Sequence, residues 1–395
     1  MRILILSADY PRFLRALYRD SPGLHDASYA VQMQARNDSL FGVADFYSRN
    51  FQAAGHQAAE IHVNNHWLQY AWARENGLAI AAPQENATVP VRPKFLRGLD
   101  CFKPVLRPLI RPFRRHRFPE WEAKVLAAQI EAMRPDVILN QDMEYVRSAT
   151  LSPHRRPGRV IVGQIAAPRP DGEDYRAYDL IVSSLPNFVR WFSNRGVRAR
   201  YNQLAFEPSV LDRAGPQPER DIPLSFVGSL SPEHAGRVAW LEEIARSAPL
   251  KVWGNGIERL PRSSPLHAVY QGEAWGREMY NILRRSRITL NYHIDLAEGW
   301  ANNMRLYEAT GSGTLLLTDR QRNINDIYAD GSEIATYSSP GECVAQIHRY
   351  LADEATRARI ADAGQRRAVT CNNYRTRTAE IVVHVQELAG NGVPA

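Results

Sequence analysis

The sequence predicts an α/β protein with two doubly wound domains, each a parallel sheet covered by helices. Three observations favour this fold class. The chain has 395 residues, which is more than one hydrophobic core usually organises. Short apolar runs bounded by polar residues, typical of buried parallel strands, alternate with helical segments. This alternation occurs twice, before and after a proline-rich stretch at residues 206–223.

The first series predicts a Rossmann-like domain at residues 1–206. Its strands are expected at 1–9, 58–63, 136–140, 159–165 and 180–183. We expect a long, partly helical loop at 10–34, followed by a helix at 35–54 that ends before Gly55. A further helix at 120–133 ends before Pro135. Strands and helices that alternate in this way form a doubly wound layer.

The second series predicts another Rossmann-like domain at residues 220–371. We expect strands at 224–229, 250–254 and 288–293, a further strand in the second half of 302–319, and helices at 237–246 and 277–285. The segment 354–388 is helical in composition, and we expect residues 372–389 to return to the first domain. Ligands of such open α/β sheets bind at the carboxyl ends of the strands.

The composition excludes several classes of protein. Hydrophobic residues make up 44% and charged residues 23% of the chain, which is typical of a globular protein and not of a disordered one. No run approaches the roughly 20 apolar residues of a spanning helix, and the apolar start is too short for a signal peptide. The cysteines Cys101, Cys343 and Cys371 are far apart, which fits neither a disulfide framework nor a metal site. We therefore expect a cytoplasmic protein.

The net charge of +7 arises from one segment. Residues 92–118 contain nine Lys or Arg and one acid, Asp100, interleaved with apolar residues. This pattern is typical of a membrane-surface site or another anionic partner, so we expect a peripheral position at the inner face of the plasma membrane. A solvated basic loop that covers a groove is an equally good explanation. Nucleic acid is not an expected partner, because no base-stacking platform or recognition helix lies nearby.

The stretch 302–319 carries the strongest functional signal. It predicts a short helix that opens on Asn302 and Asn303, ends on glycines and leads into a buried strand. The unpaired N–H groups at such a helix start suit an anion. Arg305 and Glu308 are three residues apart and share a helical face, so a cation and a carboxylate project together, as a diphosphate and a ribose diol require. A surface ion pair of little energetic worth is the alternative.

Other polar groups follow the strands of the second domain. Gly228 and Ser229 lie between a strand and a helix, where the backbone can approach a phosphate closely. Trp253–Gly256 contains G-x-G without a third glycine, which disfavours a dehydrogenase. Asn291 and His293 end the strand before 302–319, although a lone strand-end histidine is more often structural. The candidate donor-binding residues are Gly228, Ser229, His234, Arg237, Gly254, Gln271, Gly272, Asn291, Asn303, Arg305, Glu308 and Thr314.

Several of these blocks, in this order, resemble the C-terminal half of the CgeB-like (spore-maturation-type) GT-B glycosyltransferases. The blocks are 226–229, 272–276, 290–293 and 303–319, and a looser similarity extends to 178–184. The resemblance implies a GT-B architecture, in which two Rossmann-like domains face each other across a cleft, and a nucleotide-diphosphate sugar as the substrate. It also implies that Glu308 binds the nucleotide ribose and that Arg305 binds the diphosphate.

The sequence departs from the family pattern at one position. Retaining enzymes of the family-4 type pair this glutamate with another one eight residues earlier, where this chain has Trp300, and Glu298 lies ten residues before Glu308. We expect a retaining reaction, but this departure leaves the stereochemical outcome open. No D-x-D pair occurs where a bridge between a metal and the diphosphate would be expected, so we predict no metal and no cofactor.

The acceptor-side groups are expected from the first domain. Asp9 and Asp142 follow two of its predicted strands, although such an acid is more often a cap or a solvated group than a base. The candidate catalytic residues are Asp9, Asp142, His293 and Glu298.

The leading hypothesis is a glycosyltransferase of bacterial surface polysaccharide synthesis that acts on a glycan or lipid-linked acceptor. One alternative is a nucleotide-sugar epimerase of the same architecture, such as a hydrolysing 2-epimerase. The other is a non-catalytic protein that binds a nucleotide sugar.

Overall fold

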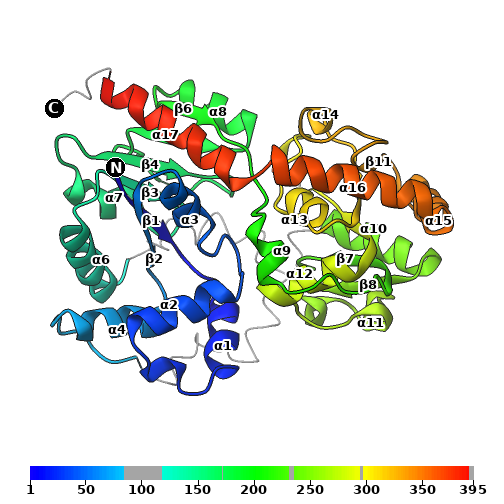
Figure 1. Ribbon diagram of the computed structural model, residues 1–395, viewed down its shortest axis with the longest axis horizontal. Helices are drawn as coiled ribbons and strands as arrows, with labels where there is room; N and C mark the ends of the chain where they lie inside the picture. The colour runs from blue at the N-terminus through cyan, green and yellow to red at the C-terminus, as the bar shows by residue number, and fades with distance from the viewer. Residues whose placement is uncertain (84–117, 171, 231–234, 294–296, 391–395) are drawn as a thin grey trace.

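The computed structural model describes residues 1–83, 118–170, 172–230, 235–293 and 297–390 (Figure 1). These residues form two parallel sheets with helices around them. The first sheet has six strands in the order β2-β1-β3-β4-β5-β6, and the second has five in the order β11-β10-β9-β7-β8. The predicted fold class, α/β with two doubly wound layers, is confirmed. The basic segment at 92–118 lies, except for Phe118, outside the described residues.

The strands of the first sheet are short and almost fully buried, as their apolar runs predict. They are β1 (Arg2–Ser7), β2 (Gln57–His62), β3 (Val137–Asn140), β4 (Val160–Gln164), β5 (Leu180–Ser183) and β6 (Ala199–Tyr201). Because every pairing is parallel, all carboxyl ends lie at one edge of the sheet. That edge carries Ser7, Gln141 and Gln164.

Helices cover both faces of this sheet. They are α1 (Pro11–Arg19), α2 (Tyr29–Asp38), α3 (Phe46–Ala53), α4 (His66–Glu75), α6 (Glu120–Met133), α7 (Ser148–Leu151) and α8 (Pro186–Ser193). The expectation of one helix at 35–54 is wrong, because residues 39–45 separate α2 from α3. Leu40 and Ala44 have φ of 57° and 39°, a left-handed backbone that interrupts a helix.

The second sheet repeats the arrangement. Its strands are β7 (Ile222–Val227), β8 (Leu250–Trp253), β9 (Ser286–Asn291), β10 (Leu315–Asp319) and β11 (Ala335–Tyr337). Its helices are α10 (Ala235–Ser247), α11 (Leu266–Val269), α12 (Gly276–Arg285), α13 (Arg305–Gly311), α14 (Ile324–Ile327), α15 (Pro340–Ala352) and α16 (Glu354–Thr370), while α9 (Ser209–Arg213) lies between the sheets. None of the helices within the described ranges is both long and apolar enough to cross a bilayer.

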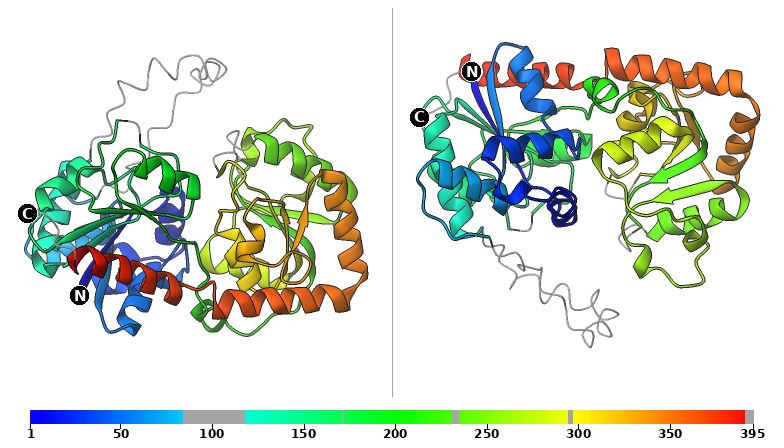
Figure 2. Two further views of the ribbon diagram at one scale, coloured as in Figure 1. Left: turned by 90° about the horizontal axis from the view of Figure 1, so that it is seen from above. Right: turned by 60° about the horizontal axis from the view of Figure 1, so that its bottom comes forward.

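The chain returns to the first half at its end. Helix α17 (Tyr374–Gly390) packs on α3, and Figure 2 shows it lying along the first half after α16 has covered the second. The ring of Tyr374 lies 5.4 Å from that of Phe46 and 5.0 Å from that of Tyr47. Phe206 hydrogen-bonds through its backbone to Asn372 and Tyr374. The segment in which the chain leaves the first half therefore lies beside the segment in which it returns. The boundaries at 206, 220 and 371 stay predictions.

A second contact joins the two halves near the carboxyl ends of the strands. The backbone N–H of Arg277 donates to the carbonyl of Ser39 at 2.6 Å. Gly276 has a φ of +50°, and a Cβ there would lie 2.0 Å from the Ser39 oxygen, so only glycine fits. Arg12 of the first half forms ion pairs with Glu273 at 2.5 Å and Glu258 at 3.1 Å. Loop 39–45 therefore takes its irregular course where it meets the second half.

Candidate active site

The described residues bring most of the predicted donor-binding groups together at the carboxyl ends of β7, β9 and β10. Because these strands pair in parallel, the turns that follow them meet at one edge of the sheet. The first turn of α13 lies beside them. The groups gathered there are Gly228, Ser229, Arg237, Asn291, His293, Asn303, Arg305 and Glu308, together with Asp319.

Arg305 and Glu308 form an ion pair inside the protein. Nη1 of Arg305 lies 2.9 Å from Oε2 of Glu308, and their side chains are 14% and 8% exposed. The alternative of a surface ion pair is therefore wrong. Burial raises the pKa of Glu308, and the charge of Arg305 opposes that rise. Nε of Arg305 has no hydrogen-bond partner among the residues that the structure describes, so the guanidinium keeps an N–H group for a ligand.

Two asparagines hold the start of α13 in place. The Oδ1 of Asn303 accepts from the backbone N–H of Leu306 at 3.2 Å, the capping role expected of an asparagine before this helix. Its Nδ2 donates to Oδ1 of Asn291 at 2.8 Å, and Asn291 donates in turn to Thr318 at 2.9 Å. These amides bond mainly to one another. They position the turn that carries Arg305.

His293 and Asp319 form a second buried pair. Nδ1 and the backbone N–H of His293 lie 2.7 and 3.0 Å from Oδ1 of Asp319, and Gln321 donates to Oδ2 at 2.6 Å. Burial raises the pKa of Asp319, but the hydrogen bonds from His293 and Gln321 outweigh it, and the pKa is lowered. An ionised Asp319 can only accept, so Nδ1 of His293 carries the proton. Nε2 of His293 is buried with no hydrogen-bond partner in the described part of the chain.

Arg237 links the turns after β7 and β9. Its guanidinium donates to the carbonyls of Tyr292 at 3.0 Å and Ser229 at 3.3 Å, and it lies 5.8 Å from the centre of the Phe226 ring. Burial lowers the pKa of Arg237, and the Asp319 carboxylate opposes that change. Arg237 thus supplies positive charge behind the His293 and Arg305 turns.

Glycines bring three backbone turns close together. The N–H of Gly228 donates to the Trp253 carbonyl, and the N–H of Gly254 donates to that of Gly272, each at 2.9 Å. A Cβ on Gly254 would lie 1.8 Å from the Gly228 oxygen, so this approach requires glycine. The side chain of Gln271 is exposed, and it donates to the nearby backbone carbonyls of Val269 and Tyr270 at 3.3 Å. Gln271 therefore lies at the outer rim of these turns.

Other predicted residues do not join this group. Thr314 precedes β10 and is therefore at the amino end of the strand, where its hydroxyl meets that of Thr289 at 3.4 Å. This position lies at the opposite end of the strand from the other candidates, and the assignment of Thr314 as a donor ligand stays a prediction. His234 lies outside the described residues.

Asp9 is enclosed in a buried ionic cluster. Its Oδ1 accepts from Arg36 at 2.6 Å, and its Oδ2 lies 3.2 Å from Nδ1 of His62. Burial raises the pKa of Asp9, but the charges and hydrogen bonds of Arg36 and His62 outweigh it and hold the pKa well below its usual range. The buried pairing occupies both carboxylate oxygens of Asp9, and its role as a base stays a prediction.

Asp142 and Glu298 lie near the boundary between the two halves. Oδ1 of Asp142 accepts from the N–H of Tyr145 at 2.9 Å and closes the turn after β3. Glu298 is exposed, with a φ of +50°. Its neighbours Ala297 and Trp300 pack in an apolar cluster of the first half, so the Glu298 loop reaches the first sheet. Both acids stay candidates.

Asp319 was not anticipated as a site residue. The sequence does contain a signal for it. Asp319 ends a predicted buried strand, and the predicted strand before that one ends at His293.

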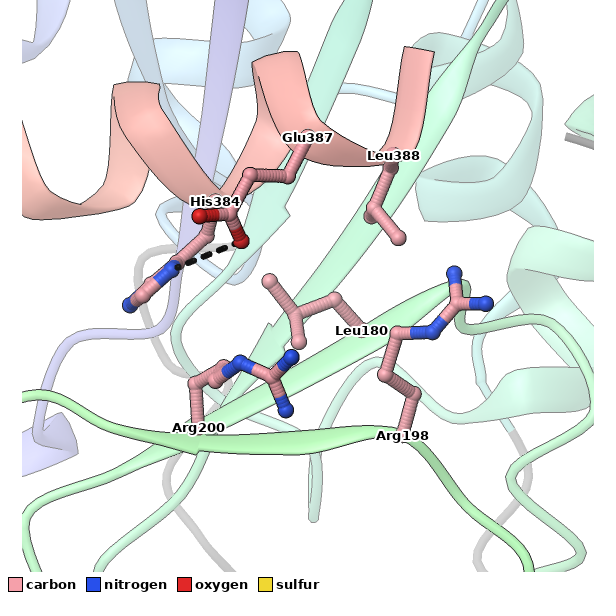
Figure 3. A pocket seen from close by; sticks show the side chains of 6 residues that line it. All are labelled: Leu180, Arg198, Arg200, His384, Glu387 and Leu388. Atoms are coloured by element: carbon pink, nitrogen blue, oxygen red, sulfur yellow. Dashed lines mark ion pairs between the residues drawn. The ribbon is translucent and has the colours of Figure 1, made fainter. Parts of the chain in front are cut away.

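Two pockets in the described part of the structure lie elsewhere. One lies between the amino ends of β5 and β6 and helix α17, where Arg198 and Arg200 face His384 and Glu387 (Figure 3). The other follows α17 past Asn50 and Glu207. Neither includes the carboxyl ends of the strands, where open α/β sheets bind ligands.

Comparisons with known proteins support the fold of two parallel sheets described above. Residues 237–382 match the family model described as glycosyl transferase-like. A glycosyltransferase from Rickettsia africae ESF-5 is 11% identical, with a TM-score of 0.56 over 99% of both chains. AviGT4, a glycosyltransferase involved in avilamycin A biosynthesis, is 14% identical, with a TM-score of 0.58 over 99% of both chains. Anabaena Alr3699/HepE, solved in complex with UDP-glucose, is 10% identical, with a TM-score of 0.56 over 98% of this chain and 100% of its own.

No curated protein matches the chain in sequence. At these identities the solved structures show the fold, which is GT-B over nearly the whole chain, and the family match covers most of the second sheet and the last helices. The narrower CgeB-like assignment stays a proposal. The family match supports a glycosyltransferase enzyme, and the solved structures show that the chain has the GT-B fold.

Proposed function

We propose that the protein transfers a sugar from a nucleotide-diphosphate donor to a glycan or lipid-linked acceptor, as a CgeB-like enzyme. The observation that carries this proposal is the Arg305–Glu308 pair. A buried guanidinium whose Nε has no hydrogen-bond partner in the described residues lies against a carboxylate at the carboxyl edge of the second sheet. These are the groups that a diphosphate and a ribose diol require. The complex of Anabaena Alr3699/HepE with UDP-glucose supports a donor of this class.

The departing diphosphate gains negative charge as the bond to the sugar breaks. Arg305 is proposed to bind that charge directly, and Arg237 to add positive potential from behind. One well-placed donor is worth about 3 kcal/mol in comparable electrostatic roles. Glu308 is proposed to accept hydrogen bonds from the ribose hydroxyls. Because arginines provide the charge, we propose that transfer needs no metal, and a complete loss of activity in EDTA would contradict this.

The reaction is proposed to retain the configuration of the sugar. Glu298 is the acid proposed to approach the sugar, since its loop contacts the first half at Ala297 and Trp300. Analysis of the product by NMR distinguishes an axial from an equatorial new bond, and an inverted product would contradict the proposal.

Donor binding is the first test. Full-length protein is screened by thermal shift against UDP-, GDP-, ADP- and CMP-linked sugars, and the binding nucleotide is then titrated calorimetrically. We expect Arg305→Ala to weaken binding by about 30-fold, or 2 kcal/mol. Glu308→Gln should weaken it less, because the amide oxygen still accepts. Arg285→Ala is the matched control, since that arginine pairs with Asp221 on the surface. Unchanged affinity in both site variants would contradict the assignment.

Turnover separates the remaining alternatives. Release of free nucleotide diphosphate together with a glycosylated acceptor supports the transferase. An epimerised sugar supports the epimerase, and binding without turnover supports the non-catalytic protein.

The cellular role proposed is bacterial surface polysaccharide synthesis at the inner face of the plasma membrane. It rests on the basic sequence at 92–118. Sedimentation with anionic vesicles should exceed that with neutral vesicles and should weaken as salt is added. Equal sedimentation with both would contradict the membrane role.

A further inference from the structure

A row of neutral polar side chains crosses the carboxyl edge of the first sheet. Ser7 Oγ donates to Oε1 of Gln141 at 3.0 Å, and Gln141 Nε2 donates to Oε1 of Gln164 at 3.0 Å. Gln164 Nε2 then donates to the hydroxyl of Tyr47 at 2.6 Å. Ser7, Gln141 and Gln164, the amide row, are each half-buried. Each amide N–H₂ has a second hydrogen beyond the bond described, so the row can still donate to a ligand.

Tyr10 provides an aromatic surface at the same edge. It is 62% exposed, more than any other large apolar side chain in the described part of the chain. Its ring centre lies 5.6 Å from that of Phe41 and 6.4 Å from that of Trp275. Burial of part of the residue raises the pKa of the Tyr10 hydroxyl, and the nearby Asp142 carboxylate adds to it. Tyr10 comes three residues after the end of β1 and caps α1, so it belongs to the same edge of the sheet as the amide row.

Three ionic groups beneath this edge are withdrawn from its surface. Asp9, Arg36 and His62 are 3%, 2% and 0% exposed, and they face one another. A ligand at the edge thus meets amides, a hydroxyl, a ring and the half-buried Asp142 carboxylate before it meets these charges. This chemistry does not favour a phosphate, which requires a positive charge within reach.

A pyranose ring has complementary chemistry. One face of the ring presents C–H groups that pack on an aromatic surface, and its rim presents hydroxyls that both donate and accept. We propose that Tyr10 and the amide row bind the saccharide unit of the acceptor, so that the enzyme glycosylates a neutral sugar. This inference rests on the proposed function, which assigns the acceptor to the first domain.

The second half completes this surface. Trp275 belongs to the segment that follows the Gly272 turn, and the same segment holds the first half through Glu273 and Gly276. The contact that joins the halves therefore also supports the ring of Tyr10. Saccharide binding and the contact between the halves are expected to strengthen each other.

The test is saturation-transfer difference NMR on the full-length protein with the methyl glycosides of α-glucose, α-mannose, β-galactose and β-N-acetylglucosamine. We expect at least one to bind with a Kd of about 1–10 mM. Tyr10→Ala should weaken it by about tenfold, whereas Tyr10→Phe should retain it because the ring remains. Gln164→Leu should weaken it by about fivefold through the loss of an amide. Thermal unfolding of each variant verifies that it is folded.

The control is Tyr201→Ala, which removes another exposed tyrosine at the end of β6, with three strands between it and β1. Its affinity should equal that of the unchanged protein. The inference is contradicted if none of the glycosides binds, if Tyr10→Ala binds as well as the unchanged protein, or if glucose 1-phosphate binds more tightly at this edge than the neutral sugars. Calorimetry with UDP on the same samples separates two failures. UDP binding without glycoside binding contradicts only this inference, whereas absent binding of every nucleotide contradicts the proposed function.

Discussion

The carboxyl edges of the two sheets present different chemistry. At the second edge, Arg305 pairs with the carboxylate of Glu308 and keeps Nε without a partner in the described structure. At the first edge, the ion pair of Asp9 and Arg36 is buried below the surface, and neutral groups such as Gln164 lie above it. One edge suits an anion and the other suits a neutral ligand rich in hydroxyls. Under the proposed function, this difference would direct the nucleotide donor to the second edge and the sugar acceptor to the first.

The largest expected effect comes from disrupting the buried ion pair between Asp9 and Arg36 beneath the first edge. Asp9→Asn leaves Arg36 buried without a counter-charge, which should lower the free energy of unfolding by about 3–5 kcal/mol. Because the folded pKa of Asp9 is depressed, its contribution is present above its unfolded pKa near 4 and falls as the pH drops below that value. Urea unfolding at several pH values measures both effects.

The control for this prediction is Asp20→Asn, which breaks an exposed pair with Arg19 and should leave stability unchanged. If Asp9→Asn protein lost nucleotide affinity without losing stability, Asp9 would take part in nucleotide binding. That result would contradict the proposal that only the second edge binds the nucleotide.

The next largest effect should come from His293. Asparagine retains an N–H near the position of Nδ1 for Asp319 but removes Nε2, whereas glutamine retains a polar group near Nε2. If Nε2 contacts a reacting group, His293→Asn should lower kcat by about 100-fold with little change in stability. His293→Gln should retain more activity. Equal kcat in the two variants and the unchanged protein would assign His293 a structural role only.

The smallest of these effects concerns a carboxyl near the first edge. Glu122 accepts from the hydroxyl of Tyr145 at 2.8 Å, and burial raises its pKa to about 7, although that hydrogen bond lowers it in part. The folded protein therefore holds this proton more tightly than the unfolded chain, and stability should fall as the pH rises from about 4.5 to 7. Glu122→Gln should add about 2 kcal/mol at pH 8 and almost nothing at pH 4.

Chemical unfolding at these two pH values tests the prediction. A gain of the same size at both would show that folding does not raise the pKa of Glu122.

Local sequence predicted most of the fold. The apolar run Leu180–Ser183 coincides with β5, and the strand expected at 136–140 is β3 with one residue fewer. The helix expected at 35–54 failed because its interruption depends on distant residues. The carbonyl of Ser39 bonds to Arg277, more than 200 positions along the chain, and no local pattern records that contact.

Sequence spacing predicted only those contacts of the site that lie within one helix. Arg305 and Glu308 lie on one turn of α13, so their proximity follows from helical geometry. The partnership of His293 with Asp319 depends on β9 pairing with β10, which sequence spacing does not reveal. Thr314 is close to Arg305 in the sequence but lies at the amino end of β10, which its spacing from Arg305 does not reveal.

The return of α17 to the first half affects how the protein is made. The rings of Phe46 and Tyr47 gain the ring of Tyr374 as a neighbour only when that residue has left the ribosome. Domains generally fold in order during synthesis, from the amino end. Here the half made first stays unfinished until the second half has been synthesised, and its apolar surface needs protection during that time. Chaperone dependence should therefore concentrate on the first half of the nascent chain.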